Sequence, residues 1–295
     1  MAKISAALVK ELRDRTDLGM MDCKRALEES DGDIEIAIEN LRKSSGMKAA
    51  KKAGRIAADG LVGVSVSDSR SVLVEVNCET DFAARDDNFV AFVNRVVSLI
   101  ADSGNGDIQA LLDDGLEAER EALVQKIGEN VSVRRAEVLD GAASSYIHNG
   151  KIGVLVQLAD GDDDLGKDVA MHVAAADPQP RFVSSDDVPE DVIAKEKEIF
   201  VAQAAESGKP PEIIEKMVGG RVKKFLAEIS LVDQPFIKNP DQKVGALLKE
   251  NGGSVSRFVR FQVGEGIEKE EVDFADEVKN QLKDADDPGN SDDKD

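Results

Sequence analysis

One stretch of the sequence decides the fold: Ser71-Val72-Leu73-Val74-Glu75-Val76-Asn77-Cys78-Glu79-Thr80-Asp81-Phe82. Its valines recur at every second position, which is the period of a β-strand with one face buried. A polar Asp68-Ser69-Arg70 turn precedes it, and before that turn three more valines alternate with small residues over 62–66. The pattern predicts an antiparallel hairpin whose second strand ends in a polar turn that carries Phe82.

The same pattern recurs later in the chain. Ser144–Ile147 and Lys151–Leu158 flank His148-Asn149-Gly150, and Asn-Gly is a strong signal for a hairpin turn. Each hairpin precedes an acidic loop and a helix with an apolar stripe, over about 88–101 in the first copy and 165–176 in the second. We therefore predict an α+β fold with a duplicated antiparallel hairpin-plus-helix core.

Helical periodicity surrounds this core. Three short helices over 5–15, 21–29 and 34–43 predict a small N-terminal bundle of the ubiquitin-associated type. The basic segment Arg42–Arg55 is predicted to be a solvated, partly helical linker, or else a tether whose bases meet an acidic partner. Two helices over 189–226, broken at Gly208–Pro211, predict an inserted antiparallel helical hairpin.

These patterns divide the chain into five parts. A helix over 117–127 is expected in the connector of the core, a helix over 243–250 and a strand over 255–263 in its second half, and a last helix over 272–282. The predicted parts are the bundle with its linker over 1–54, the first core subdomain over 55–141, the second core subdomain over 142–181 and 229–266, the inserted hairpin over 182–228, and the C-terminal helix with a disordered acidic tail over 267–295.

The composition restricts the classes of function. The 295 residues carry 38 Lys and Arg against 59 Asp and Glu, so the net charge is −21 and direct binding to nucleic acid is not expected. No apolar run approaches the about 18 residues that span a bilayer, and no signal-peptide pattern begins the chain, so we expect a cytoplasmic protein without a membrane partner. Two cysteines and two histidines predict free thiols, no metal site and no cofactor.

A search for catalytic motifs finds one near-miss. Gly161–Lys167 has the spacing of a phosphate-binding loop, but Asp168 stands where Ser or Thr would bind magnesium, and three aspartates would repel phosphates. Cys23 and His148 could in principle form a nucleophile and its base, although a lone Cys is more often a small buried hydrophobe. His172 lies on an apolar helix face and is interpreted as a core histidine with satisfied hydrogen bonds. We predict a protein that is not an enzyme.

Two segments indicate a surface for a protein partner. Leu12–Leu27 contains Met20-Met21 at a helix start, and methionine adapts well to binding surfaces, although one of the two could instead fill the bundle core. Glu75–Arg85 leaves a strand and enters a loop in which Phe82 stands between Asp81 and two alanines. The ring could fold back onto the core, or point outward and dominate an interface.

Both segments resemble the two signature motifs of the elongation factor Ts family, and the resemblance covers nearly the whole chain. Shorter stretches match in the same order: Lys126-Ile127-Gly128-Glu129-Asn130, Gly150–Val156, Gln234-Pro235-Phe236 and Val263–Lys269. The resemblance implies a guanine-nucleotide exchange factor for translation elongation. Such a protein binds the GDP-bound and nucleotide-free forms of elongation factor Tu, displaces magnesium and releases GDP so that GTP can bind.

The resemblance also implies roles for individual residues. The segment that displaces magnesium and binds the partner would be Thr80, Asp81, Phe82 and Ala83, with Phe82 as a wedge between two helices of the partner. Ala83 departs from the valine that is usual in the family, and Lys238 departs from an apolar pair. The other implied partner contacts are Leu12, Met20, Met21, Lys24, Ile127, Gly128, His148, Ile237 and Lys238.

Two rival functions stay open. A non-catalytic acidic adaptor with a ubiquitin-associated-like binding head would explain residues 1–43 but not the duplicated core. An enzyme that used the Gly161 loop would bind nucleotide by itself. The inserted hairpin also leaves a choice, because it could pair with a second copy in a 2:2 complex with elongation factor Tu, or stand free.

Overall fold

The predicted hairpin is present and forms two of the three strands of the first sheet. The computed structural model describes residues 4–16, 18–205 and 210–268. In it β1 (Asp59–Val66) and β2 (Arg70–Cys78) pair antiparallel, and β3 (Ser132–Asp140) pairs with the other edge of β2. Because every residue of β2 after Arg70 is buried, this strand packs on both of its faces.

A second sheet repeats this topology. β4 (Ser144–His148) and β5 (Ile152–Asp160) form its hairpin, α8 (Asp163–Ala175) packs on it, and β8 (Ser254–Gln262) pairs with β5. In both sheets the second strand of the hairpin is central and all pairs are antiparallel. The predicted α+β class is confirmed, and the duplicated hairpin-plus-helix pattern is visible in the strand order.

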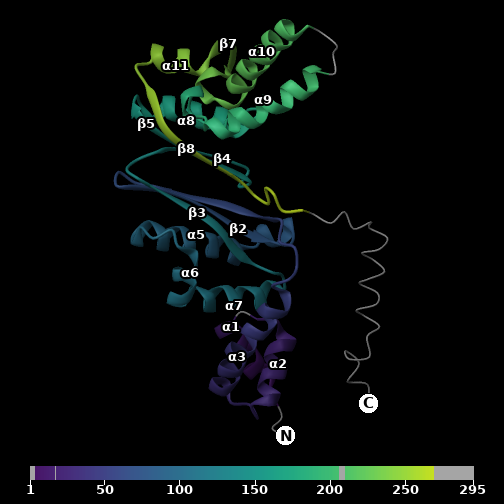
Figure 1. Ribbon diagram of the computed structural model, residues 1–295. Helices are drawn as coiled ribbons and strands as arrows, with labels where there is room; N and C mark the ends of the chain where they lie inside the picture. Colours follow the sequence, from purple (N-terminus) through teal and green to yellow (C-terminus); the bar gives the residue numbers. More distant parts are fainter. Residues whose placement is uncertain (1–3, 17, 206–209, 269–295) are drawn as a thin grey trace. The chain divides into compact units, whose positions relative to one another are not determined.

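The two sheets pack face to face, and helices cover their other faces (Figure 1). One apolar cluster joins the sheets through Val62, Leu73, Leu139, Ala143, Leu155 and Phe261. On the opposite side of β2 the valines pack against α5 (Asp87–Ser103), which is backed by α7 (Glu117–Ile127). The alternation of the valines therefore separates a helix-facing side of β2 from a sheet-facing side.

The remaining elements are short or inserted. α4 (Asp81–Ala84) follows β2, and α6 (Ile108–Leu111) leads through a kinked segment, Leu112–Leu116, into α7. The inserted hairpin consists of α9 (Glu190–Ala205) and α10 (Pro211–Ile229), whose Phe200 and Phe225 rings meet edge to face at 6.4 Å. Short 3-10 helices lie at Ser185–Asp187 and Leu231–Asp233, and β6 (Pro235–Phe236), β7 (Asn239–Lys243) and α11 (Val244–Glu250) precede β8.

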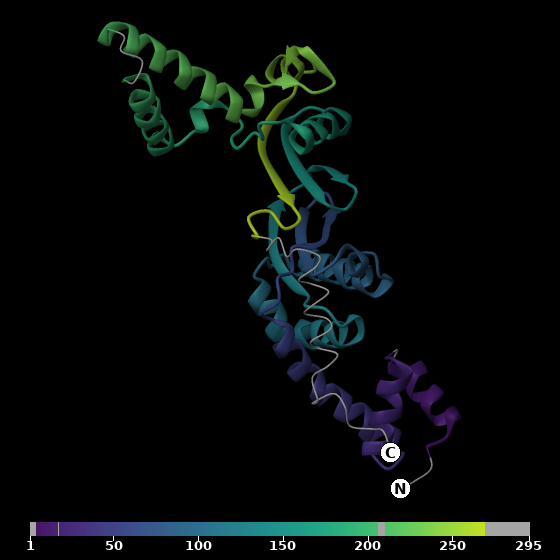
Figure 2. The same ribbon diagram turned by 90° about the vertical axis from the view of Figure 1, so that its right-hand side faces the viewer.

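The N-terminal bundle contains α1 (Ala6–Thr16), α2 (Met20–Glu29) and α3 (Ile34–Lys52). The segment over 42–55, predicted to be a solvated and partly helical linker, is helical as far as Lys52, because α3 continues through it without a break (Figure 2). Ser45 and Ala49 are buried, and Ala49 belongs to the core cluster of the first sheet. One face of the basic segment is therefore core, which its charged residues conceal in the sequence.

The third strand of the first sheet was not predicted. The sequence of β3 places Arg134, Arg135 and Glu137 among its apolar residues, which hides the alternation of a strand. The helix expected over 272–282 and the tail over 284–295 lie outside the described residues, and the domain boundaries stay predictions. The described residues up to Glu265 form one compact unit. Within residues 4–16, 18–205 and 210–268, no helix is long and apolar enough to cross a membrane.

A buried carboxylate ties the first sheet to the end of the second. Glu75 is fully buried and accepts hydrogen bonds from Arg135 Nε at 2.5 Å, Arg134 Nη1 at 3.0 Å, Asn77 Nδ2 at 3.0 Å and the Gly264 N–H at 2.8 Å. Burial alone would raise the pKa of Glu75, but these donors together outweigh burial and lower its pKa. Gly264 follows β8, so the charge holds the two halves together.

We expect Glu75→Ala to lower the free energy of unfolding by about 3 kcal/mol, because it removes one partner of a buried ion pair. Urea denaturation at pH 7 measures this loss. Because the pKa of Glu75 is lowered in the folded state, its contribution is present above the pKa of the unfolded carboxyl group and is lost as the pH falls through the folded value.

Glu137→Ala is the matched control, since it removes a more exposed pair with Arg257 and is expected to cost less than about 1 kcal/mol. The role of Glu75 would be contradicted if both variants lost the same free energy of unfolding. It would also be contradicted if the difference between them did not become smaller at acidic pH.

Candidate functional site

The turn after β2 exposes one large apolar ring. Thr80 caps α4, and its hydroxyl accepts a hydrogen bond from the Ala83 N–H at 3.2 Å. Ala83 and Ala84 are buried, whereas the Phe82 side chain is 80% exposed. The ring therefore lies outside the core, and the alternative in which it folds back is excluded. Asp81, beside the ring, pairs at 2.9 Å with Arg85, the residue that caps the end of this short helix.

A second segment holds this turn in place. The Glu129 carboxylate accepts hydrogen bonds from the Glu79 N–H at 3.1 Å, the Thr80 N–H at 3.0 Å and the Thr80 hydroxyl at 2.7 Å. In return the Glu79 carboxylate accepts the Asn130 N–H at 2.6 Å. Glu79 and Glu129 thus join residues 79–80 to residues 129–130 by hydrogen bonds in both directions. These bonds fix the backbone just before the turn that carries Phe82.

Ile127 and Gly128 end α7 next to this junction. Gly128 has a φ of +82°, and a Cβ there would meet open space, so the left-handed backbone, and not packing, favours glycine. The end of α3 supports the same corner, because Lys52 Nζ donates to the Gly128 carbonyl at 2.5 Å. The side-chain amide of Asn130 donates to the Arg55 carbonyl at 2.9 Å. The basic end of α3 is therefore part of the frame around Phe82.

His148 lies at the end of β4, and its side chain is exposed. The Tyr146 hydroxyl lies 3.2 Å from its Nδ1 atom, and the two rings stack with centroids 6.2 Å apart. The hairpin turn that follows reaches the first sheet, because the Gly150 carbonyl accepts the Val62 N–H at 2.8 Å. Since β1 begins beside the end of β2, the His148 turn lies at the end of the first sheet from which Phe82 emerges.

A separate surface lies on the bundle. Met20 and Met21 are 60% and 67% exposed at the start of α2, so neither methionine fills the bundle core. With Lys24 and residues of α1 they line a hollow of about 540 Å³. Leu12, by contrast, is fully buried in the core of the bundle. It supports this surface from beneath and does not form it.

Ile237 and Lys238 lie on a third surface, in the turn between β6 and β7. Ile237 is 41% exposed, and the Lys238 ammonium pairs with Asp168 at 2.5 Å. Behind them His172 is buried and hydrogen-bonded through both ring nitrogens, which confirms its interpretation as a satisfied core histidine. Burial lowers the pKa of His172.

The suspected catalytic groups do not come together. Cys23 is buried in the bundle, whereas His148 belongs to β4. The other cysteine, Cys78, was not a candidate, and burial raises the pKa of its thiol to about 12. In the Gly161 loop an acidic side chain occupies the start of the following helix, where a phosphate would have to bind. Asp162 caps α8 by accepting a hydrogen bond from the Leu165 N–H at 2.9 Å. In the part of the chain that the structure describes, no three His, Cys, Asp or Glu side chains gather as metal ligands would.

Sequence reasoning missed the supports of the site. Glu129 was noted only as a member of a matching stretch, and neither its contact with Thr80 nor that of Lys52 with Gly128 was expected. Hydrogen bonds between residues 49 or 76 positions apart leave no local pattern in a sequence. In the sequence, the only sign of these contacts is that Glu79 and Glu129 stand next to Thr80 and Gly128. Two glutamates are weak evidence for a contact in a chain with 59 acidic residues.

Comparisons with known proteins agree on one family. The family model described as Elongation factor TS matches residues 79–265. The chain is 62% identical over 287 residues to the elongation factor Ts of Hahella chejuensis, covering 96% of this chain and 100% of that protein. It is 58% identical over 282 residues to the elongation factor Ts of Marinobacter nauticus, with 94% and 97% covered. The protein of the same name from Cellvibrio japonicus is 58% identical over 286 residues, with 96% and 98% covered.

We expect Glu129→Ala to release the turn that carries Phe82. Hydrogen bonds to charged groups contribute about 1.5–3 kcal/mol each, so the backbone amides of Glu79 and Thr80 should exchange with solvent about tenfold faster or more. Hydrogen–deuterium exchange of the native protein measures this. Glu119→Ala is the control, since Glu119 lies on α7, the helix that precedes Glu129, but pairs with Arg95 at 3.5 Å. Unchanged exchange at these two amides would show that Glu129 does not hold the turn.

Proposed function

This chain belongs to the elongation factor Ts family, and we propose that it is the guanine-nucleotide exchange factor for elongation factor Tu. In this proposal it binds the GDP-bound form of elongation factor Tu, displaces the magnesium ion and releases GDP, so that GTP can bind. It then leaves the nucleotide-free form as GTP enters, and it makes or breaks no covalent bond. The observation that carries the proposal is the exposed ring of Phe82 on a short helical turn that Glu129 holds at its start.

The proposed action of Phe82 is that of a wedge. Burying a phenylalanine side chain gains about 1.5–3 kcal/mol, and Phe82 is 80% exposed within its own chain. The ring would enter between two helices of the GTP-binding domain of elongation factor Tu. Because Thr80 and Glu129 hold the turn, the partner's helices would move in preference to the wedge.

Magnesium makes the nucleotide pocket sensitive to such a movement. The ion requires near-octahedral oxygen ligands at about 2.0–2.1 Å, so a helix shift of about an ångström weakens its coordination. Linkage makes the effect mutual, because this protein weakens nucleotide binding by the same factor by which nucleotide weakens binding of this protein. A coupling of about 1–3 kcal/mol corresponds to roughly 5–150-fold.

The other surfaces would supply affinity and orientation. Ile127 and Gly128 would press one of the two helices, and His148 would hold the other. Met20, Met21 and Lys24 would grip a further helix of the same domain, with Leu12 behind them. The Ile237–Lys238 turn would contact the third domain of the partner. The Lys238 ammonium is already paired with Asp168. The side chain of this turn that would contact the partner is therefore the apolar Ile237.

The helical hairpin is proposed as a site of self-association in a 2:2 complex. A hollow of about 1010 Å³ lies along α9 and α10, lined by Ile193, Val201, Ile214, Val218 and Val222 among others. Val201→Lys is expected to convert a 2:2 complex with elongation factor Tu into a 1:1 complex, because it places a charge in this apolar hollow. Sedimentation of the complex measures the change. A 1:1 complex already for the unmodified protein would reject this part of the proposal.

The wedge is tested by the rate at which labelled GDP leaves elongation factor Tu in stopped flow. Phe82→Ala should lower the maximal release rate by about tenfold or more, within the roughly 5–150-fold range of typical coupling, while the complex still forms. A double variant, Met20→Ala with Met21→Ala, should instead raise the half-saturating concentration with little change in the maximal rate.

Val90→Ala, which truncates an exposed apolar side chain on the neighbouring α5, is the control for Phe82. An unchanged release rate for Phe82→Ala would reject the wedge. A complex that forms without faster GDP release by the unmodified protein would favour the adaptor. Binding of GDP to this chain alone in calorimetry would favour an enzyme.

A further inference from the structure

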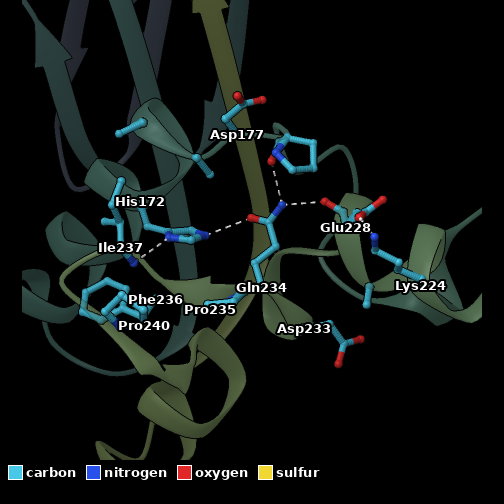
Figure 3. Close-up of a pocket in the computed structure, with 14 residues that line it drawn as sticks. His172, Asp177, Lys224, Glu228, Asp233, Gln234, Pro235, Phe236, Ile237 and Pro240 are labelled. Atoms are coloured by element: carbon cyan, nitrogen blue, oxygen red, sulfur yellow. Dashed lines mark hydrogen bonds and ion pairs between the residues drawn. The ribbon is translucent and has the colours of Figure 1, made fainter.

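A buried polar chain lies behind the Ile237–Lys238 turn (Figure 3). The pocket there has a volume of about 370 Å³ and lies between the end of α8, the end of α10 and the loop that contains β6. His172 and Gln234 are 2% and 5% exposed, and the Phe236 ring lies against the imidazole with centroids 6.0 Å apart. Two polar side chains at this depth require partners in the protein.

The hydrogen bonds fix the imidazole in one form. The backbone N–H of Ile237 can only donate, and it lies 3.2 Å from His172 Nδ1, so Nδ1 accepts. The proton of a neutral ring is then on Nε2, which lies 2.9 Å from Gln234 Oε1 and donates to it. The Gln234 amide nitrogen in turn donates to the Pro178 carbonyl at 2.8 Å and the Glu228 carbonyl at 2.6 Å.

One side chain of α8 therefore has a backbone atom of the exposed turn as its direct partner. A second contact lies one helical turn earlier, where Asp168 pairs with Lys238 at 2.5 Å. His172 is buried and Asp168 is partly exposed, so water can compete for the ion pair more readily than for the imidazole bond. Of the two contacts, the imidazole bond is the one that can fix the orientation of the turn.

We propose that His172 is a positioning residue that, in its neutral form, holds the Ile237–Lys238 turn in the orientation in which it binds elongation factor Tu. The proposal rests on the proposed function and extends it to a residue that does not touch the partner. A protonated ring would carry a hydrogen on both nitrogens, and its Nδ1–H would face the Ile237 N–H. The bond would be lost and the turn released.

The surroundings of the ring favour the neutral form. Its two hydrogen-bonding partners, the Ile237 N–H and the Gln234 amide, carry no charge. The charged and titratable groups of the neighbouring elements lie around the same pocket and turn: Asp168 on α8, Asp177 after it, Lys224 and Glu228 on α10, Asp233, and Lys238 on the turn itself. Asp168 and Lys238 pair with each other, and Asp233 pairs with Lys243 at 2.9 Å.

Two substitutions separate the two bonds of the ring. In His172→Asn the amide oxygen can take the place of Nδ1 and accept the Ile237 N–H. In His172→Gln the amide nitrogen can take the place of Nε2 and donate to Gln234, but no acceptor remains for Ile237. Full-length variants are tested for the half-saturating concentration and the maximal rate of labelled GDP release from elongation factor Tu, and for exchange of the Ile237 amide.

His172→Gln should raise the half-saturating concentration about fivefold, the factor that corresponds to about 1 kcal/mol for one hydrogen bond, with the maximal rate unchanged. His172→Asn should stay near the unmodified value and keep the Ile237 amide protected. Asp168→Asn is the control on the same helix and should change the concentration less than His172→Gln does.

A pH series on the unmodified protein avoids any folding defect of a variant. The half-saturating concentration should rise as the pH falls below the ordinary range of histidine, and His172→Asn, measured with the same elongation factor Tu, should remove this extra rise. Folding stability should fall in the same direction, since the pKa of His172 is lowered in the folded state and the unfolded chain takes up the proton first.

The inference is overturned if His172→Gln and His172→Asn behave alike, or if the Ile237 amide loses protection without any change in the half-saturating concentration. Equal pH profiles for the unmodified protein and His172→Asn would also overturn it. Failure of the proposed function looks different, because the unmodified protein would then not accelerate GDP release at all.

Discussion

The carboxylate of Glu75 is the constraint on which both sheets depend. A charge with no exposure to water is tolerated only when donors surround it, and here the donors come from β2, from β3 and from Gly264 in the turn after β8. Separating the two halves of the core would remove the Gly264 N–H from this carboxylate and leave Arg134, Arg135 and Asn77 as its donors. The duplicated fold is thus joined by a polar centre as well as by the apolar cluster between the sheets.

This rigid centre explains why the exposed groups lie where they do. Phe82, the His148 turn and the Ile237 turn each follow the end of a strand, namely β2, which is buried after Arg70, β4 and β6. The proposed action, distortion of a partner, requires that this protein deform less than the partner does. Hydrogen-bonded support behind each exposed side chain meets this requirement: Glu129 holds the turn of Phe82, and the buried His172 holds that of Ile237.

Much of the fold could be predicted because its signals are local. The alternating valines of β2, the Asn149-Gly150 turn and the helix over 117–127 follow from periods of two and 3.6 and from turn chemistry. The strand β3 could not, because its arginines are there to neutralise Glu75 and so interrupt the apolar pattern. Exposed residues such as Met20 and Phe82 were identified as candidates, but their orientation depends on packing that only the structure contains.

The uninterrupted α3 has a consequence for how the protein can evolve. It begins in the bundle that carries Met20 and ends at Lys52, which is bonded to the corner beside Phe82. Each residue added to an α-helix advances it by about 1.5 Å and turns it by about 100°. A single insertion or deletion within α3 would swing the bundle around the core. Substitutions on its exposed side are therefore tolerable, whereas its length is fixed by the two surfaces that it joins.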